Sequence, residues 1–136
     1  MTEPEPPGGT PPITILIVDD VPDMRFLARH YLESAGFQVA DEAIDGHDAV
    51  AKFLALGAPP IPTVVLIDNM MPKLTGLEAA AQMLAQSPDQ LIVLYSAYLD
   101  DSVHEAAKRL GVTACVSKSE LENLPTIIGD LITARG

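Results

Sequence analysis

The chain has 136 residues, 48% of them hydrophobic, and its 19 acidic and 8 basic side chains give a formal net charge of −11. This length fits one globular domain. The negative charge argues against nucleic acid or an anionic membrane as a partner, because both attract basic surfaces. One cysteine excludes an internal disulfide and a metal site built from several cysteines. The sequence shows neither the apolar core of a signal peptide nor an apolar run of membrane-spanning length, so we expect a cytoplasmic protein.

Residues 1–12 differ in composition from the rest of the chain. They hold five prolines, two glycines and two glutamates. Such a segment has too little apolar surface to pack, so we expect a disordered, proline-rich tail. Residues 13–136 are then predicted to form one folded domain.

From residue 13 onward, apolar runs alternate with amphipathic segments. The predicted strands, most of them rich in β-branched residues, are residues 13–18, 37–43, 63–68, 91–95 and 112–117. The predicted helices, each with apolar residues at helical spacing, are residues 22–35, 46–56, 77–87, 100–110 and a last one. The third strand is an unbroken apolar run, typical of a strand buried on both faces of a parallel sheet. Five strand–helix alternations with short connections therefore predict an α/β fold.

Apolar spacing also predicts which helix residues face the core. For the second helix these are Ala49, Val50, Phe53 and Leu54, and for the fourth Val103, Ala106, Ala107 and Leu110. The last helix has two candidate starts. Ser119 and Glu122 have the spacing of a capping box, but Pro125 would then fall inside the helix, where proline is unfavourable. A start at Asn123, with Pro125 in the first turn, is the better prediction.

Polar side chains stand at the carboxyl ends of four predicted strands. Asp19 and Asp20 follow the first strand, Asp68 ends the third, Ser96 follows the fourth and Lys118 follows the fifth. Open α/β sheets build their sites at this edge. If the first strand lies beside the third, Asp20 and Asp68 come together.

Three carboxylates brought together repel one another, by about 4 kcal/mol for two charges ~4 Å apart at an effective dielectric of about 20. Either one of them takes up a proton or a divalent cation lies among them. Oxygen ligands, with room left for water and phosphate, suit Mg²⁺ better than zinc. With the ion bound, Asp68 keeps one oxygen free as a nucleophile toward a phosphoryl group. Lys118 then offers a cation, and Ser96 a hydroxyl, to the phosphoryl oxygens.

Four pieces of sequence together resemble the receiver domain of bacterial two-component response regulators. They are Leu16-Ile17-Val18-Asp19-Asp20, the Asp-x-x-Met-Pro-x-x-x-Gly run over residues 68–76, the apolar strand into Ser96-Ala97, and Lys118 after the fifth strand. Each piece alone is a weak signal, whereas all four in this order and spacing are highly specific. The resemblance covers about residues 13–132.

This resemblance implies a flavodoxin-like (βα)5 three-layer sandwich whose five-stranded parallel sheet has the order 2-1-3-4-5. It implies that Asp68 accepts a phosphoryl group from a histidine kinase or a histidine phosphotransfer protein. Asp20 and Asp68 would hold Mg²⁺, with Asp19 acting through water and the Met70 carbonyl as a further ligand. Ser96 and Lys118 would respond to the phosphoryl group. The chain would be a signalling protein rather than an enzyme, although such domains catalyse their own phosphorylation from small donors and their own dephosphorylation.

The chain departs from the usual family pattern at two positions next to Lys118. Three residues before the lysine the family usually has Tyr or Phe, and this chain has Cys115, which bears on how Ser96 would be coupled to an aromatic. After the lysine the family usually has proline, and this chain has Ser119. A Lys-Ser pair resembles the subclass that usually carries a helix-turn-helix output domain. The sequence contains no such domain, so we expect a stand-alone receiver that signals through protein contacts.

Bulky residues stand two positions beyond Asp68 and Ser96. They are Met70 and Tyr98. We hypothesise that they screen an acyl phosphate on Asp68 from water and so lengthen its life.

Other readings remain open. Each polar residue taken singly has an ordinary structural explanation, such as a helix-capping aspartate or an exposed lysine. A phosphatase of the haloacid-dehalogenase kind also uses an aspartyl nucleophile with Mg²⁺, but it needs a second acid where this chain has Met70. A receiver fold that signals by binding alone, without phosphorylation, is the alternative that Cys115 and Ser119 favour.

Overall fold

The structure is a computed structural model that describes residues 13–57 and 62–135. The predicted disordered tail lies outside the described residues. Within them, five strands alternate with five α-helices, and one 3-10 helix, η1 (Lys118–Asn123), precedes the last helix. The strands are β1 (Thr14–Val18), β2 (Gln38–Ala43), β3 (Val64–Asp68), β4 (Leu91–Ser96) and β5 (Ala114–Ser117). The α-helices are α1 (Pro22–Ser34), α2 (Gly46–Leu56), α3 (Gly76–Gln86), α4 (Asp101–Leu110) and α5 (Leu124–Arg135).

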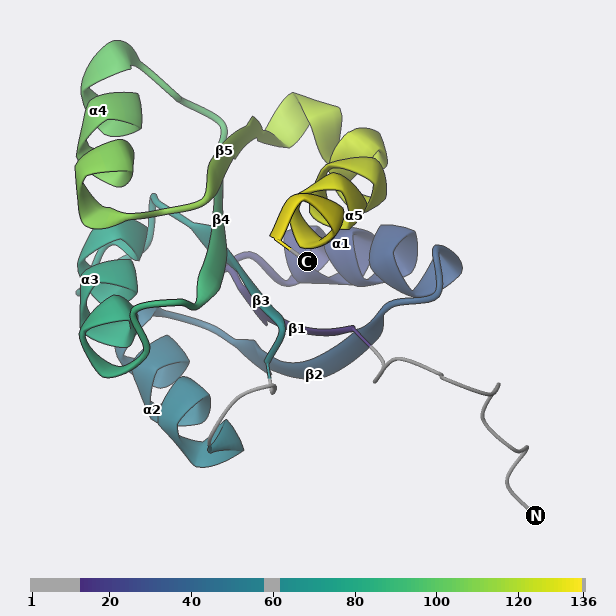
Figure 1. The fold of residues 1–136 in the computed structure, drawn as a ribbon, viewed down its shortest axis with the longest axis horizontal. Coiled ribbons are helices and arrows are strands. Elements are labelled where there is room, and N and C mark those ends of the chain that lie inside the picture. Colours follow the sequence, from purple (N-terminus) through teal and green to yellow (C-terminus); the bar gives the residue numbers. More distant parts are fainter. Residues whose placement is uncertain (1–12, 58–61, 136) are drawn as a thin grey trace.

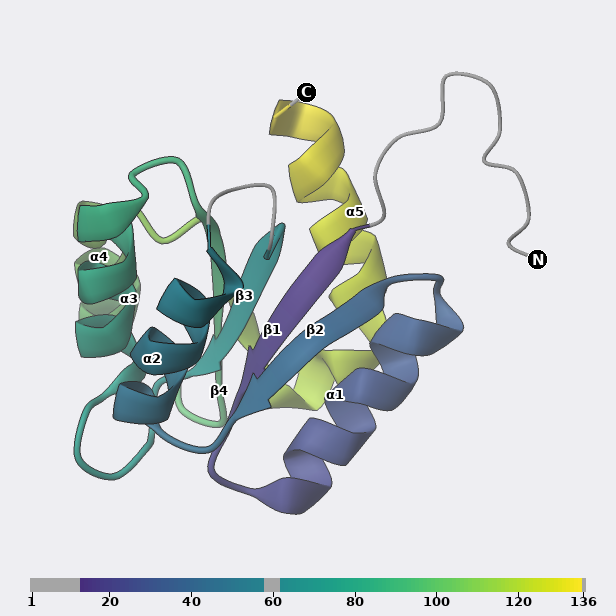
Figure 2. The same cartoon turned by 90° about the horizontal axis from the view of Figure 1, so that it is seen from below.

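The strands form one parallel sheet of order β2-β1-β3-β4-β5. Helices α2, α3 and α4 cover one face, and α1 and α5 cover the other (Figure 1). Figure 2 shows β3, β1 and β2 side by side between these two helical layers. The predicted flavodoxin-like sandwich and its strand order are therefore confirmed.

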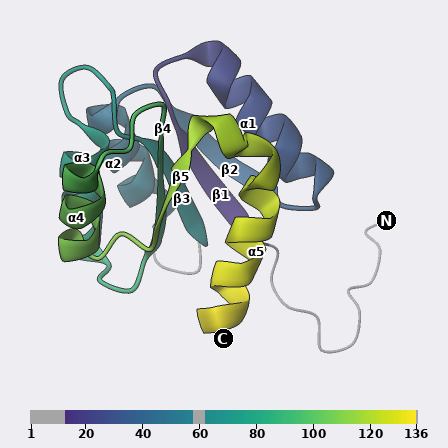
Figure 3. The same cartoon turned by 90° about the horizontal axis from the view of Figure 1, so that it is seen from above.

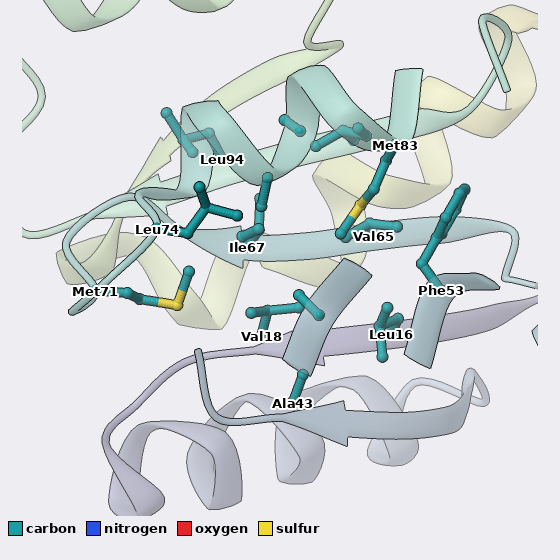
Figure 4. Packing of buried hydrophobic residues seen from close by; sticks show 14 of the residues in the cluster. Leu16, Val18, Ala43, Phe53, Val65, Ile67, Met71, Leu74, Met83 and Leu94 are labelled. Atoms are coloured by element: carbon teal, nitrogen blue, oxygen red, sulfur yellow. The ribbon is translucent and has the colours of Figure 1, made fainter. Parts of the chain in front are cut away.

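The three central strands, β1, β3 and β4, are wholly buried because they contribute side chains to two separate cores. In β1, Leu16 and Val18 belong to the core under α2, α3 and α4, whereas Ile15 and Ile17 belong to the core under α1 and α5. Successive side chains of a strand point to opposite faces. The sequence of a strand covered on both faces is therefore a continuous run of apolar residues. Figure 4 shows the first core, with Met83 of α3 packed against Val65 of β3.

Side-chain caps fix the starts of three helices. The Asp45 carboxylate accepts the Asp48 amide at the start of α2 (2.7 Å), and the Asp100 carboxylate accepts the Val103 amide at the start of α4 (2.9 Å). Thr75 and Glu78 form a complete capping box at α3. This capping box follows the loop that leaves the Asp68 strand, and it was not among the sequence-based predictions.

The structure corrects two predicted core residues. Leu54 is 53% exposed and Leu110 is 38% exposed, although both were predicted to face inward. Leu54 lies about 100° further round the helix than the buried Phe53, and α2 has only one side against the sheet. Leu110 is the last residue of α4, at the surface between α3 and α4.

The start of the last helix agrees with the sequence to within one residue. Helix α5 begins at Leu124, one residue after the predicted start, and Pro125 is its second residue. The preceding six residues form η1, which the sequence did not predict. The side chain of Ser117, rather than that of Ser119, caps η1 by accepting the Ser119 amide (3.3 Å).

Candidate functional site

The register of the sheet brings the predicted strand-end residues to one edge. Val18 of β1 pairs with Ile67 of β3, so Asp19 and Asp68 follow at neighbouring positions. One carboxylate oxygen from each of Asp19, Asp20 and Asp68 lies within 4.8 Å of the others. Asp19 and Asp68 are buried, whereas Asp20 reaches the solvent. The predicted acidic cluster is therefore present.

Lys118 neutralises part of this cluster. Its Nζ lies 3.1 Å from Asp19 Oδ2 and 3.1 Å from Asp68 Oδ2. The lysine side chain is 16% exposed, and those of Asp19 and Asp68 are 0% and 2% exposed. One ammonium thus serves two buried carboxylates. Such pairs compensate the loss of hydration only when further hydrogen bonds complete them.

Further donors complete the hydrogen bonding of each buried carboxylate. Asp19 Oδ1 accepts the Val21 amide (2.9 Å), and Asp19 Oδ2 accepts the hydroxyl of Tyr95 (2.5 Å). Asp68 Oδ1 accepts the Met70 amide (3.1 Å). Both oxygens of each buried acid therefore have a described partner.

The charges and burial of the cluster shift its pKa values. Burial raises the pKa of Asp68, and this effect outweighs the Met70 amide and Lys118, which lower it. Burial alone would lower the pKa of Lys118, but the negative charges of Asp19 and Asp68 outweigh it, so the lysine stays firmly protonated. Burial, together with the charge of Asp19, raises the pKa of Tyr95 well above its ordinary value. The pocket therefore holds Asp68 in an environment that disfavours its negative charge.

The loop after Asp68 is tied back to the end of β3. The Asn69 carbonyl accepts the amides of Met71 and Gly76 (both 3.2 Å), and the Asn69 side chain accepts the Leu77 amide (3.2 Å). Gly76 runs against the Asp68 carbonyl so closely that a Cβ at this position would collide with it. This contact explains the glycine of the Asp-x-x-Met-Pro-x-x-x-Gly run.

Ser96 lies at the same edge, fully buried at the end of β4. Tyr95 pairs with Asp68, so Ser96 stands one residue further along its strand. Its described hydrogen bond is with the amide of Tyr98, which donates to the Ser96 hydroxyl oxygen (3.3 Å). Its predicted contact with a phosphoryl group stays a prediction.

The side chains of Met70 and Tyr98 are 61% and 77% exposed and lie in the loops that leave Asp68 and Ser96. A depression of about 390 Å³ opens beside the acids. Its lining residues are Asp20, Asn69, Met70, Met71, Pro72 and Thr75. The predicted role of the Met70 carbonyl as a ligand stays a prediction.

The residues at this edge fit Mg²⁺. They offer carboxylate oxygens from three residues, and one of these acids reaches the solvent, where water ligands can complete the shell. Mg²⁺ prefers oxygen ligands and keeps several waters. The raised pKa of Asp68 means that a cation there would relieve an existing electrostatic penalty.

Two residues at the site were missed by the sequence analysis. Tyr95 donates to Asp19, and Arg25 of α1 donates from its guanidinium to the Asp19 carbonyl (2.8 Å). Tyr95 carried a usable signal, since a tyrosine within a buried strand needs a partner for its hydroxyl. Arg25 carried none, because one arginine on a helix surface does not indicate its partner.

The two departures next to Lys118 lie away from the carboxylates. Cys115 is half-buried, contacts the core under α2, α3 and α4, and has its pKa raised by burial. Ser119 is exposed in the first turn of η1.

The chain was compared with known proteins. The profile of the response regulator receiver domain matches residues 15–128. The chemotaxis protein CheY of Thermotoga maritima is 35% identical over 83 residues, which cover 61% of this chain and 66% of that protein. CheY of Treponema pallidum is 32% identical over 112 residues, covering 82% of this chain and 76% of that protein.

Solved structures agree with the sequence comparison. The chemotaxis protein CheY4 of Vibrio cholerae superposes with a TM-score of 0.79 at 26% identity, covering 89% of this chain and 99% of that one. Among the residues that the structure describes, no helix is both long and apolar enough to span a membrane. The profile match covers most of the chain and the fold agrees with it, so this chain belongs to the response regulator receiver domain family.

Proposed function

We propose that this receiver accepts a phosphoryl group on Asp68, with Mg²⁺, from the phosphohistidine of a histidine kinase or phosphotransfer protein. The observation that carries the proposal is the arrangement around Asp68. Its buried carboxylate lies within 4.8 Å of two further acids and 3.1 Å from the Lys118 ammonium. This arrangement would bring together a nucleophile, oxygen ligands for a cation and a positive charge.

Phosphoryl transfer would replace a P–N bond to histidine with a P–O bond to Asp68. A carboxylate oxygen of Asp68 attacks phosphorus, the P–N bond to histidine breaks, and an acyl phosphate forms. The histidine nitrogen leaves with the bonding electron pair and takes a proton from water. When bound, Mg²⁺ would supply charge neutralisation on the phosphoryl oxygens, held by Asp20 and Asp68 directly, by the Met70 carbonyl, and by Asp19 through water.

Lys118 and Ser96 would convert the modification into a signal. Lys118 now divides its contacts between Asp19 and Asp68, and a phosphoryl group on Asp68 would offer it new oxygens. Ser96 holds the amide of Tyr98 through its hydroxyl oxygen, so a new bond to phosphate would affect the following loop. A modification shifts a conformational equilibrium only through contacts that differ between the two states. The signal would then pass to a downstream protein by direct contact.

Two observations support a signalling role rather than a phosphatase. The relatives described above are chemotaxis proteins by name. Two residues after Asp68, where a phosphatase of the haloacid-dehalogenase kind needs a carboxyl group, the chain has Met70, whose side chain is largely exposed.

Intact mass spectrometry after incubation with acetyl phosphate and Mg²⁺ tests the proposal. We expect the wild-type chain to gain the mass of one phosphoryl group, and we expect EDTA to prevent the gain. Asp68→Asn should gain nothing, whereas Asp89→Asn, which changes an exposed acid at the opposite edge of the sheet, should behave as wild type. No gain in the wild-type chain would favour a module that signals without phosphorylation, and an equal gain in Asp68→Asn would mean that a residue other than Asp68 accepts the phosphoryl group; either result would overturn the proposal.

A further inference from the structure

Tyr95 is a wholly buried tyrosine whose hydroxyl enters the acidic cluster. We propose that Tyr95 is a positioning residue that fixes the Asp19 carboxylate and, through it, keeps Lys118 shared between Asp19 and Asp68. The inference rests on the proposed function, since it concerns how the pocket is prepared for a cation and a phosphoryl group.

The sheet delivers Tyr95 to this place. On β4 it pairs with Asp68 of β3 on one side and Val116 of β5 on the other. Its ring belongs to the core under α1 and α5. Only the hydroxyl reaches the polar edge, where it donates to Asp19 Oδ2 at 2.5 Å. Figure 3 shows β5 beside β4, with α5 next to β5.

Tyr95 contacts the lysine as well as the aspartate. The Lys118 ammonium lies 5.1 Å from the centre of the Tyr95 ring, within the range of a cation–π interaction. The same ammonium contacts Asp19 Oδ2, the oxygen that accepts the Tyr95 hydroxyl. Tyr95, Asp19 and Lys118 therefore form a closed set of three contacts.

The hydroxyl decides how strongly Asp19 attracts the lysine. Asp19 Oδ1 is held by the Val21 amide, and Oδ2 is shared by Tyr95 and Lys118. Without the hydroxyl, Lys118 would be the one described donor left on Oδ2. A buried carboxylate with fewer donors binds its remaining cation more tightly. The ammonium would then move toward Asp19 and away from Asp68, and the Asp19 carboxylate would lose one of its three fixed contacts.

This change should weaken Mg²⁺ binding. An ammonium held more tightly inside the cluster is harder to displace, and a less fixed Asp19 is less well oriented toward a hydrated ion. For the unphosphorylated Tyr95→Phe variant we expect the Mg²⁺ dissociation constant to rise three- to tenfold, measured by amide chemical shifts in NMR. Phenylalanine keeps the ring and its packing and removes only the hydroxyl.

Tyr31→Phe is the matched control, because Tyr31 is a partly buried tyrosine packed on the same core. It should bind Mg²⁺ within twofold of wild type. A dissociation constant for Tyr95→Phe that is also within twofold, or lower than that of wild type, would overturn the inference. A wild-type chain that does not bind Mg²⁺ would instead overturn the proposed function, and this inference with it.

A second experiment separates positioning from packing and needs no metal. Tyr95→Phe is measured by thermal unfolding in the wild-type and in the Asp19→Ala background. If the hydroxyl acts through Asp19, the Tyr95→Phe substitution lowers Tm in the wild-type background. In the Asp19→Ala background, where the hydroxyl has lost its acceptor, the same substitution is neutral or stabilising. An equal loss of Tm in both backgrounds would show a packing role only and would overturn the inference.

Discussion

Two ionic clusters lie next to each other at the end of β1, and they differ in charge balance and in burial. In the surface cluster, Arg25 and Arg29 of α1 both contact Glu42 of β2, at 3.1 and 2.7 Å. In the site cluster, Asp19 and Asp68 both contact Lys118. The Arg25 guanidinium joins the two by donating to the Asp19 carbonyl.

The difference lies in the balance of charge and in its exposure. Arg29 also contacts Glu33 (3.2 Å), so the surface cluster has two cations and two acids, and its side chains are between 17% and 50% exposed. The site cluster, which consists of Asp19, Asp20, Asp68 and Lys118, has a surplus of acid, and two of its three carboxylates are buried. An unbalanced buried charge costs stability. The surface cluster therefore has balanced, solvated charges, whereas the site cluster keeps an unbalanced buried charge that a bound cation would offset.

The largest expected effect comes from removing the one cation of the site cluster. Lys118→Met keeps the length of the side chain but leaves two buried carboxylates unpaired, so we expect the free energy of unfolding to fall by about 3–5 kcal/mol at neutral pH. Urea unfolding measures this loss, and Mg²⁺ should restore part of it. Lys73→Met, an exposed lysine in the neighbouring loop, is the control. A loss below about 1 kcal/mol would mean that the two clusters do not differ as described.

Removing an acid from the site cluster should raise the free energy of unfolding rather than lower it. Because the pKa of Asp68 is raised above its ordinary value of 3.8 in the folded chain, the folded state binds this proton more tightly than the unfolded state. The stability from this group is complete at low pH and falls as pH rises through the folded pKa. Without Mg²⁺, Asp68→Asn should therefore be more stable than wild type at pH 7.

This difference should close as pH falls toward 4. Unfolding by urea at a series of pH values, in EDTA, measures the effect. A gap between the two proteins that stays constant with pH, or that widens in acid, would contradict the raised pKa.

A substitution in the surface cluster should lower the free energy of unfolding only slightly, and Mg²⁺ should not change this loss. We expect Glu42→Gln to lower the free energy of unfolding by about 1 kcal/mol or less, because exposed ion pairs contribute little. The loss should shrink at high salt, since mobile ions screen such pairs. If Mg²⁺ restores stability to Glu42→Gln as it does to Lys118→Met, the two clusters act as one, and the distinction between them fails.

The smallest expected effect concerns the open rim of the site. If Met70 and Tyr98 screen the acyl phosphate, Met70→Ala with Tyr98→Ala should speed its hydrolysis about threefold, equivalent to roughly 0.7 kcal/mol in the barrier. Decay of phosphorylated protein, followed by intact mass, measures this rate. Leu54→Ala, an exposed apolar residue on α2, should leave it unchanged. An unaltered rate in the double variant would rule out screening.

The sequence predicted the strands and the acids at their ends because both follow from local patterns. An apolar run ending in Asp68 indicates a buried strand, and parallel strands gather their carboxyl ends at one edge. The order of the strands was implied by resemblance to the family and did not follow from the residues alone.

Contacts made across the sheet or at the surface could not be predicted in this way. Tyr95 and Asp19 are 76 positions apart, and no local pattern specifies that pair. Whether Leu54 is buried or exposed depends on the rotation of α2 about its own axis, which is set by packing against the sheet. The 3-10 turn of η1 likewise depends on how Leu121 packs into the core.

Whether the strand-end acids form one cation-binding pocket is tested most directly by the dependence of Tm on Mg²⁺ concentration at constant ionic strength. A ligand that binds only the folded state raises its stability in proportion to RT ln(1 + [L]/Kd). We predict that the wild-type Tm rises with Mg²⁺ concentration, that Glu42→Gln shows the same rise, and that Asp20→Asn with Asp68→Asn loses it. A wild-type Tm that does not change with Mg²⁺, or an equal rise in the doubly substituted chain, would contradict the account.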